Sequence, residues 1–97
     1  MTNEPRNQSN VEHGNLLLRP IPKPEKVLTA AEVAAFTLAT GGATHILTGR
    51  IEPATIEVST GTAIPVVHVL EPSFLIDEEH HTLPVEPGWY EIVGQHV

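Results

Sequence analysis

Turn-forming residues divide the second half of this chain into short segments, and their spacing constrains the fold more than any other feature. Gly49, Gly61 and the Pro87-Gly88 pair separate runs that are rich in β-branched and apolar residues. With the further breaks at 71–72 and 77–81, turns recur about every eight to twelve residues, which is typical of a β-sandwich or a β-barrel and unlike alternating strands and helices. A chain of 97 residues has room for one modest core. We therefore expect a small, single-domain, mainly antiparallel all-β fold, either a barrel or a sandwich.

The individual strands are predicted from alternation and from β-branched composition. They are expected at 44–48, 55–59, 63–70, 73–76, 82–85 and 89–93. Pro65 has no backbone N–H to donate to a neighbouring strand, so it indicates a sheet edge or a bulge. Prolines at every second position from Pro20 to Pro24 predict that residues 20–26 run extended, as an edge or a connector.

The first half of the chain carries two further predictions. Residues 1–13 are polar and nearly devoid of apolar side chains, so we expect a flexible N-terminal tail, followed by a single β-rich domain over 14–97. Thr29 and Glu32 have the spacing of a helix capping box, and the alanines around them are strong helix formers. A short helix near 30–35 is therefore expected, although strand is an equally good reading of the residues that follow.

Charge excludes several classes of partner. The formal net charge is -7, and the chain has no Lys or Arg after Arg50. This acidic half argues against binding to nucleic acid or to an anionic membrane, and it would attract cations or a basic protein. The apolar runs are shorter than the roughly 20 residues of a membrane span. The polar N-terminus also lacks the apolar segment of a signal peptide.

Six histidines are the unusual feature of the composition. His80 and His81 directly follow three carboxylates in the segment 77–81, DEEHH, and imidazoles with carboxylates are common ligands of divalent metals. No strand can direct all five side chains at one ion, so a site would need a ligand from elsewhere, with His45 or His68 as candidates. A solvated acidic turn explains the same segment. His68, on an apolar strand, is expected to be structural or outward-facing.

Other chemistry has little support in the sequence. The Gly-x-Ser-x-Gly nucleophile motif, the His-Glu-x-x-His zinc motif and a glycine-rich phosphate loop are all absent. The absence of cysteine excludes disulfides, thiolate metal ligands and a cysteine nucleophile. Trp89 and Tyr90, which follow the Pro87-Gly88 turn, are expected to anchor the core.

Four segments together resemble a known group of proteins. They are residues 38–49, LATGGATHILTG; residues 70–72, LEP; residues 77–80, DEEH; and residues 87–95, PGWYEIVGQ. In this order they are similar to small uncharacterised proteins of bacteria and their phages that read LAEGEATGHAHxL and then EPATLTHEEHxxIxLPPGxYxVxxQ. Residues 14–18, GNLLL, also resemble the GDVLL start of that group. The likeness covers most of residues 14–96.

The resemblance implies a possible ligand set without implying an activity. His45 matches the second histidine of GHAH, and His80 matches the last histidine of HEEH, whereas Ala43 and Asp77 replace the other two. If the group's histidines bind metal, this chain keeps His45, His80 and the carboxylate of Asp77, with Glu79 close by. Two imidazoles and a carboxylate are an acceptable set for zinc or iron. If they do not, the same residues are ordinary surface.

Two hypotheses about function follow. The first is a non-enzymatic interaction or assembly module, belonging to a phage particle or a bacterial complex, that binds a protein partner or a second copy of itself through edge strands and the N-terminal tail. It would be cytoplasmic or, if phage-encoded, part of the virion. The second is a divalent-metal-binding protein or small metalloenzyme that holds an ion such as zinc with His45, Asp77, Glu79 and His80. No other cofactor is implied.

Overall fold

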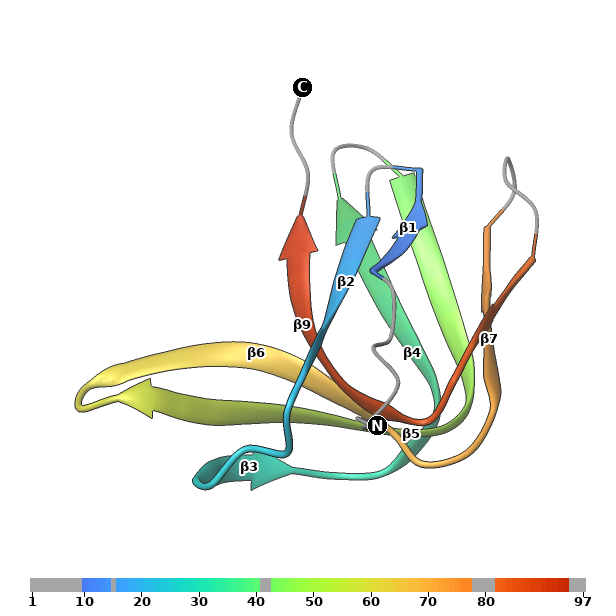
Figure 1. The fold of residues 1–97 in the computed structure, drawn as a ribbon. Helices are drawn as coiled ribbons and strands as arrows, with labels where there is room; N and C mark the ends of the chain where they lie inside the picture. The colour runs from blue at the N-terminus through green and yellow to red at the C-terminus, as the bar shows by residue number, and fades with distance from the viewer. Residues whose placement is uncertain (1–9, 15, 41–42, 78–81, 95–97) are drawn as a thin grey trace, which may run out of the picture.

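The computed structural model describes residues 10–14, 16–40, 43–77 and 82–94, and within these ranges it contains β-strands and no helix (Figure 1). The strands are β1 (Val11–His13), β2 (Leu16–Ile21), β3 (Val27–Ala30), β4 (Val33–Thr40), β5 (Ala43–Ser59), β6 (Thr62–Val69), β7 (Ser73–Ile76), β8 (Leu83–Val85) and β9 (Gly88–Gly94). All the pairings between them are antiparallel. The all-β antiparallel prediction is confirmed.

The strands form one sheet that curls into a nearly closed barrel. Its order is β1-β2-β9-β6-β5-β7-β8, and β3 and β4 pair with β5 beside this path. The far ends of β5 and β6, together with β3, extend away from the barrel as an arm (Figure 1). Strands β1 and β8 stand at the two ends of the sheet order, so the gap between them is the seam of the barrel.

β5 is the longest strand and belongs to both the barrel and the arm. Its first part pairs with β4 and β7, and its second part pairs with β6 and β3. The exchange of partners occurs around Gly49, whose φ of 141° lies outside the range that other residues readily adopt. The two strands predicted at 44–48 and 55–59 are therefore parts of one continuous strand, and the expected turn at Gly49 is a change of partners within it.

The inward-facing side chains of the barrel form the main core. Alternation produces it: Leu16 and Leu18 of β2 are fully buried, whereas Leu17 between them is only half-buried. The same alternation on the other strands completes a cluster of apolar side chains: Leu16, Leu18, Leu38, Leu47, Ile51, Val67, Val69, Leu75, Val85 and Tyr90. The hydroxyl of Tyr90 donates a hydrogen bond to the backbone carbonyl of Glu86, 2.7 Å away, so its polar end is satisfied.

A second, smaller cluster lies on the other face of β6. Val66 and its neighbour Val67 are both buried, and they belong to different clusters. Ala54, Ile56 and Val66 make up the second cluster, and Trp89 is a partly buried side chain packed against it. The prediction that Trp89 anchors the core is therefore only partly right: Tyr90 is in the main core, and Trp89 lies on the opposite face of β9, because neighbouring residues of a strand point to opposite sides.

Among the described residues, two prolines lie at positions where their strand has a neighbour on one side alone. β1 pairs with β2 only as far as Leu18, so Pro20 has β9 alone beside it. β9 pairs with β6 only from Val66 onward, so Pro65 has β5 alone beside it. Both residues are thus at sheet edges, where a missing N–H is tolerated, as the sequence predicted.

The helix expected near 30–35 is absent, and that prediction was wrong. Ala30 pairs with Ala54 and Val33 pairs with Ile51, so this segment contributes to two strands against β5. Glu32, which would have completed the capping box, instead accepts a hydrogen bond from the guanidinium of Arg50 at 2.8 Å. A helix of so few residues is marginal by itself, and pairing with a long neighbouring strand satisfies the same backbone groups.

The N-terminal boundary of the domain also differs from the expectation. Val11–His13 form β1, and the side chain of His13 is buried, although the sequence assigned these residues to a flexible tail. The composition of this polar segment does not indicate a strand, but its backbone pairs with β2. Residues 1–9 of the predicted tail lie outside the described residues. In the described part of the chain, no helix has the length and apolar character that crossing a membrane requires.

The two aromatic residues of β9 lie on opposite faces of the strand, so truncating each of them should lower the free energy of unfolding by a different amount. Tyr90 is 1% exposed in the main core, so Tyr90→Ala should lower the free energy of unfolding by about 3 to 5 kcal/mol. Trp89→Ala removes a half-buried ring and should cost clearly less, about 1 to 3 kcal/mol. Urea denaturation of both variants measures the difference. A larger loss for Trp89→Ala would contradict the assignment of the two faces.

Two glycines with positive φ provide a matched test of the packing around β5. A Cβ on Gly49 would lie 2.8 Å from the Cβ of buried Ser73, whereas a Cβ on Gly61, at φ 79°, would meet nothing within 4 Å. Gly61→Ala should therefore cost only the backbone strain, about 1 to 2 kcal/mol. Gly49→Ala should cost about 1 to 3 kcal/mol more, because the added Cβ overpacks against Ser73 and because alanine is more strained at φ 141° than at φ 79°. Equal losses of stability in the two variants, measured by thermal or urea unfolding, would contradict the expected clash with Ser73.

Candidate metal centre

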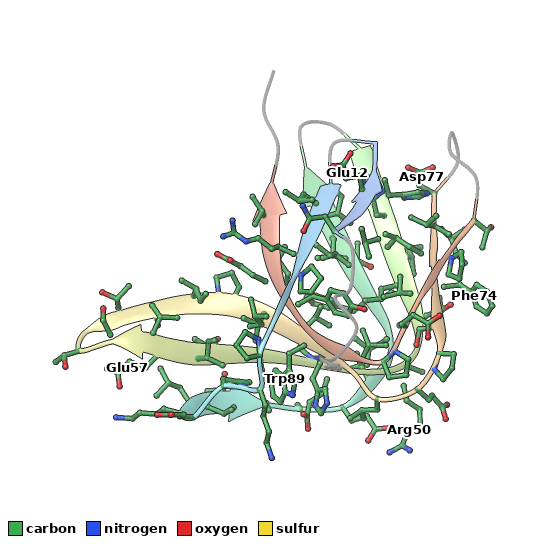
Figure 2. All side chains as sticks on the ribbon, in the orientation of Figure 1. Glu12, Arg50, Glu57, Phe74, Asp77 and Trp89 are labelled. Carbon is green, nitrogen blue, oxygen red and sulfur yellow. The ribbon has the colours of Figure 1, made fainter. Side chains whose placement is uncertain are left out.

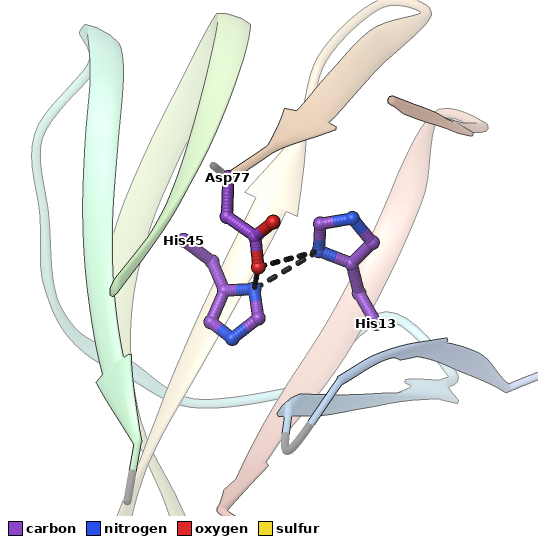
Figure 3. A group of neighbouring side chains, drawn as sticks. All are labelled: His13, His45 and Asp77. Atoms are coloured by element: carbon purple, nitrogen blue, oxygen red, sulfur yellow. Dashed lines mark hydrogen bonds and ion pairs between the residues drawn. The ribbon is translucent and has the colours of Figure 1, made fainter. Parts of the chain in front are cut away.

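Three strands bring two imidazoles and a carboxylate together inside one end of the barrel (Figure 3). His13 is the last residue of β1, His45 lies near the start of β5, and Asp77 directly follows β7. These strands are far apart in the sequence and are not neighbours in the sheet, apart from β5 and β7. The site therefore exists only because the sheet curls.

Strand register accounts for the position of each side chain. His45 is buried two residues before Leu47, so it occupies an inward position of β5. Ile46 pairs with Ile76, and continuing this antiparallel register by one residue sets Asp77 opposite His45. His13 is the inward-facing residue at the end of β1. Alternation and register, rather than a local motif, thus build the cluster.

The potential ligand atoms of the three side chains lie close to one another. Nδ1 of His13 is 2.9 Å from Nδ1 of His45, and Nδ1 of His45 is 3.2 Å from Oδ2 of Asp77. Nδ1 of His13 is 4.0 Å from the same carboxylate oxygen. The side chains are almost completely buried, with 4%, 0% and 4% of the surfaces of His13, His45 and Asp77 exposed.

The two close contacts of His45 Nδ1, to His13 and to Asp77, cannot both be good hydrogen bonds made by one proton. Two imidazole nitrogens at 2.9 Å require a proton between them, because two lone pairs repel and two N–H groups clash. If His45 Nδ1 carries that proton, it can point well at either His13 or Asp77, and the other acceptor then faces it at a poor angle. If His13 Nδ1 carries it, the lone pair of His45 faces the carboxylate oxygen at 3.2 Å.

A cation between the three atoms accepts all the lone pairs at once. Zinc bonds of about 2.0 to 2.1 Å in a tetrahedral arrangement separate ligand atoms by about 3.4 Å, and an octahedral arrangement separates neighbouring ligands by about 3 Å. The three observed separations, 2.9, 3.2 and 4.0 Å, lie around these values. The cluster therefore has the donor types and the dimensions of part of a divalent-metal site.

The sequence predicted this cluster in part. The structure brings together His45 and Asp77 of the predicted ligand set, while Glu79 and His80 lie outside the described residues. His13 was missed, because its polar neighbours made residues 1–13 look like a tail. Its available signal was Gly14, a residue suited to the turn between two antiparallel strands, directly before the alternation of Leu16 and Leu18.

His68, the other candidate partner, lies elsewhere. Its ring stacks on Trp89, with centroids 4.0 Å apart and planes 11° from parallel, and its Nδ1 lies 3.2 Å from Oε1 of Glu52. These contacts join directly paired residues of β5, β6 and β9 on the outer face of the sheet. The half-buried, structural role expected for His68 agrees with this geometry.

Comparison with known proteins gives a family and no activity. No protein with curated annotation and no solved structure matches the chain significantly. One family model, described as "Domain of unknown function (DUF8820)", matches residues 12–95. This range contains all three residues of the buried cluster as well as every strand except the first residue of β1. The chain therefore belongs to the DUF8820 family of domains of unknown function.

Proposed function

We propose that this protein binds one divalent transition-metal ion, of the zinc class, through His13, His45 and Asp77, and that the ion stabilises the barrel. The observation that carries the proposal is the convergence of two Nδ1 atoms and one carboxylate oxygen within 4.0 Å of one another in a buried position. A cation there would add favourable electrostatic contacts to a buried carboxylate.

The donor set favours zinc or a similar ion over calcium or magnesium. Imidazole nitrogens suit zinc, copper, iron and nickel, whereas calcium and magnesium prefer oxygen ligands. The chain has no cysteine, so it has no thiolate ligand to offer to a metal. Two nitrogens and one oxygen also fit iron, so the identity of the metal is an outcome of the experiment below.

The burial of the ligands favours a structural role for the ion. Catalytic zinc sites keep a coordination position open to water or substrate, whereas structural sites are closed. Here the three ligand side chains are at most 4% exposed. The ion would also join β1, at one end of the sheet order, to β5 and the end of β7, so binding would hold the curled sheet together. This supports a non-enzymatic metal-binding protein rather than a metalloenzyme.

A further ligand is needed to complete a tetrahedral site. The sequence predicted Glu79 and His80 as ligands, two and three residues after Asp77. That prediction stands as part of the proposal, and substitution of each residue tests it. The first hypothesis, an interaction module, does not conflict with a structural ion, since metal-stabilised domains commonly bind other proteins.

Zinc is expected to raise the melting temperature of purified, metal-free protein at pH 7.5 in 0.15 M salt. At one hundred times the dissociation constant, a ligand that binds only the folded state adds about 2.7 kcal/mol, equivalent to at least about 10 °C for a domain of this size. Because imidazole must be deprotonated to bind metal, the shift should be much smaller at pH 5. Calorimetry with elemental analysis should give one ion per chain.

Matched variants distinguish zinc binding at the buried cluster from diffuse zinc binding to the acidic surface. His13→Ala, His45→Ala and the nearly isosteric Asp77→Asn should each lose most of the zinc-induced shift, and His80→Ala should do so if His80 is a ligand. His68→Ala should keep it, because His68 lies on the outer face. Diffuse binding to carboxylates would be largely screened at this salt concentration and would be insensitive to a single imidazole. Equal shifts in all variants, or none in the parent, would contradict the proposal.

A further inference from the structure

The seam of the barrel contains a groove that is separate from the buried cluster. It has a volume of about 460 Å³ and is lined by both end strands of the sheet and by the start of β9: Asn10, Val11, Glu12, Leu83, Pro84, Glu86 and Tyr90. None of the ligand atoms discussed above lines it. The groove is therefore a second feature of the molecule, with chemistry of its own.

The strands on either side of the groove each have one partner. Among the described residues, β1 pairs only with β2, and β8 pairs only with β7. Each thus turns one backbone edge toward the seam, and an edge of this kind is the template for addition of an extended peptide. Pro84 has no N–H to donate, which makes β1 the better template and β8 the opposite wall.

The side chains lining the groove specify the chemistry of an occupant. Val11, Leu83 and Pro84 provide accessible apolar surface, while two lining carboxylates, Glu12 and Glu86, are exposed. None of the described lining residues is basic, and the chain has no Lys or Arg beyond residue 50. A second copy of this chain, with its formal charge of -7, would be repelled.

We propose that this seam groove is a binding site for an extended peptide in which apolar and basic residues alternate. The peptide pairs with the seam-facing side of β1, its apolar side chains contact Val11 and Leu83, and its basic side chains lie near Glu12 and Glu86. Alternation is required because successive side chains of a strand point to opposite faces. The proposal does not depend on the metal, because the groove and the buried cluster use different side chains.

Titration of ¹⁵N-labelled full-length protein with an unlabelled nine-residue peptide of alternating valine and lysine tests the proposal in 0.15 M salt. Saturable shifts are expected at the amides of Val11, Glu12 and Leu83. A peptide with glutamate in place of lysine should bind at least tenfold more weakly. Equal binding of both peptides, shifts confined to other strands, or no saturable shift would overturn the proposal.

Charge-reversal variants identify where the peptide binds. Glu12→Lys combined with Glu86→Lys should weaken binding at least tenfold, whereas Glu25→Lys combined with Glu71→Lys, which changes the net charge equally outside the groove, should change it less than twofold. Because Glu12 adjoins His13, Glu86→Lys alone is the second test and should weaken binding at least threefold. Equal effects of the two pairs would show diffuse attraction. If the same amides shift with protein concentration in the absence of peptide, the groove is an interface between two copies of the chain. Either result overturns the proposal.

Discussion

Backbone pairing along both sides of β5 is the interaction on which the rest of this structure depends. One continuous strand of 17 residues contacts β4 and β7 through its first part and β3 and β6 through its second. Three of its residues, His45, Leu47 and Ile51, are fully buried. The barrel, the arm and the buried polar cluster therefore share a single structural element, and the change of partners at Gly49 joins them.

The buried cluster includes a side chain of β1, a strand that has few backbone pairings. Within the part of the chain that the structure describes, β1 has three residues and pairs with β2 alone, and a pairing of this length contributes little stability by itself. Yet its last residue, His13, reaches across the interior to side chains from β5 and the end of β7 (Figure 3). Figure 2 shows Glu12 and Asp77 at the same end of the barrel. An ion there would connect β1, at one end of the sheet order, to β5 and to the residue that follows β7, without a backbone hydrogen bond between them.

Local sequence patterns were sufficient to predict the fold class but not the pairing. Alternation, turn spacing and proline positions are local, and they correctly indicate an antiparallel all-β chain with edges at Pro20 and Pro65. Glycine at position 49 has the same local appearance whether it forms a turn or lets a strand exchange partners, so the continuity of β5 was not predictable. Helix propensity near residue 30 was likewise outweighed by pairing with β5, which is a contact distant in sequence.

Only those site residues that belong to a local sequence pattern, or that match the group of similar proteins, could be predicted from the sequence. His45 and Asp77 were identified from the histidine and acid cluster and from the resemblance to GHAH and HEEH sequences. His13 has no such motif, and its position near Asp77 depends on the closure of the barrel, a property of the whole sheet. Residues of this kind become visible only when register and curvature are known.

The most direct measurement is an anomalous-difference map from crystals of the zinc-loaded protein, collected above the zinc absorption edge. We expect one strong peak per chain inside the barrel, about 2.0 to 2.2 Å from Nδ1 of His13, Nδ1 of His45 and an oxygen of Asp77. Peaks confined to surface carboxylates, with the two Nδ1 atoms still in direct contact, would contradict it.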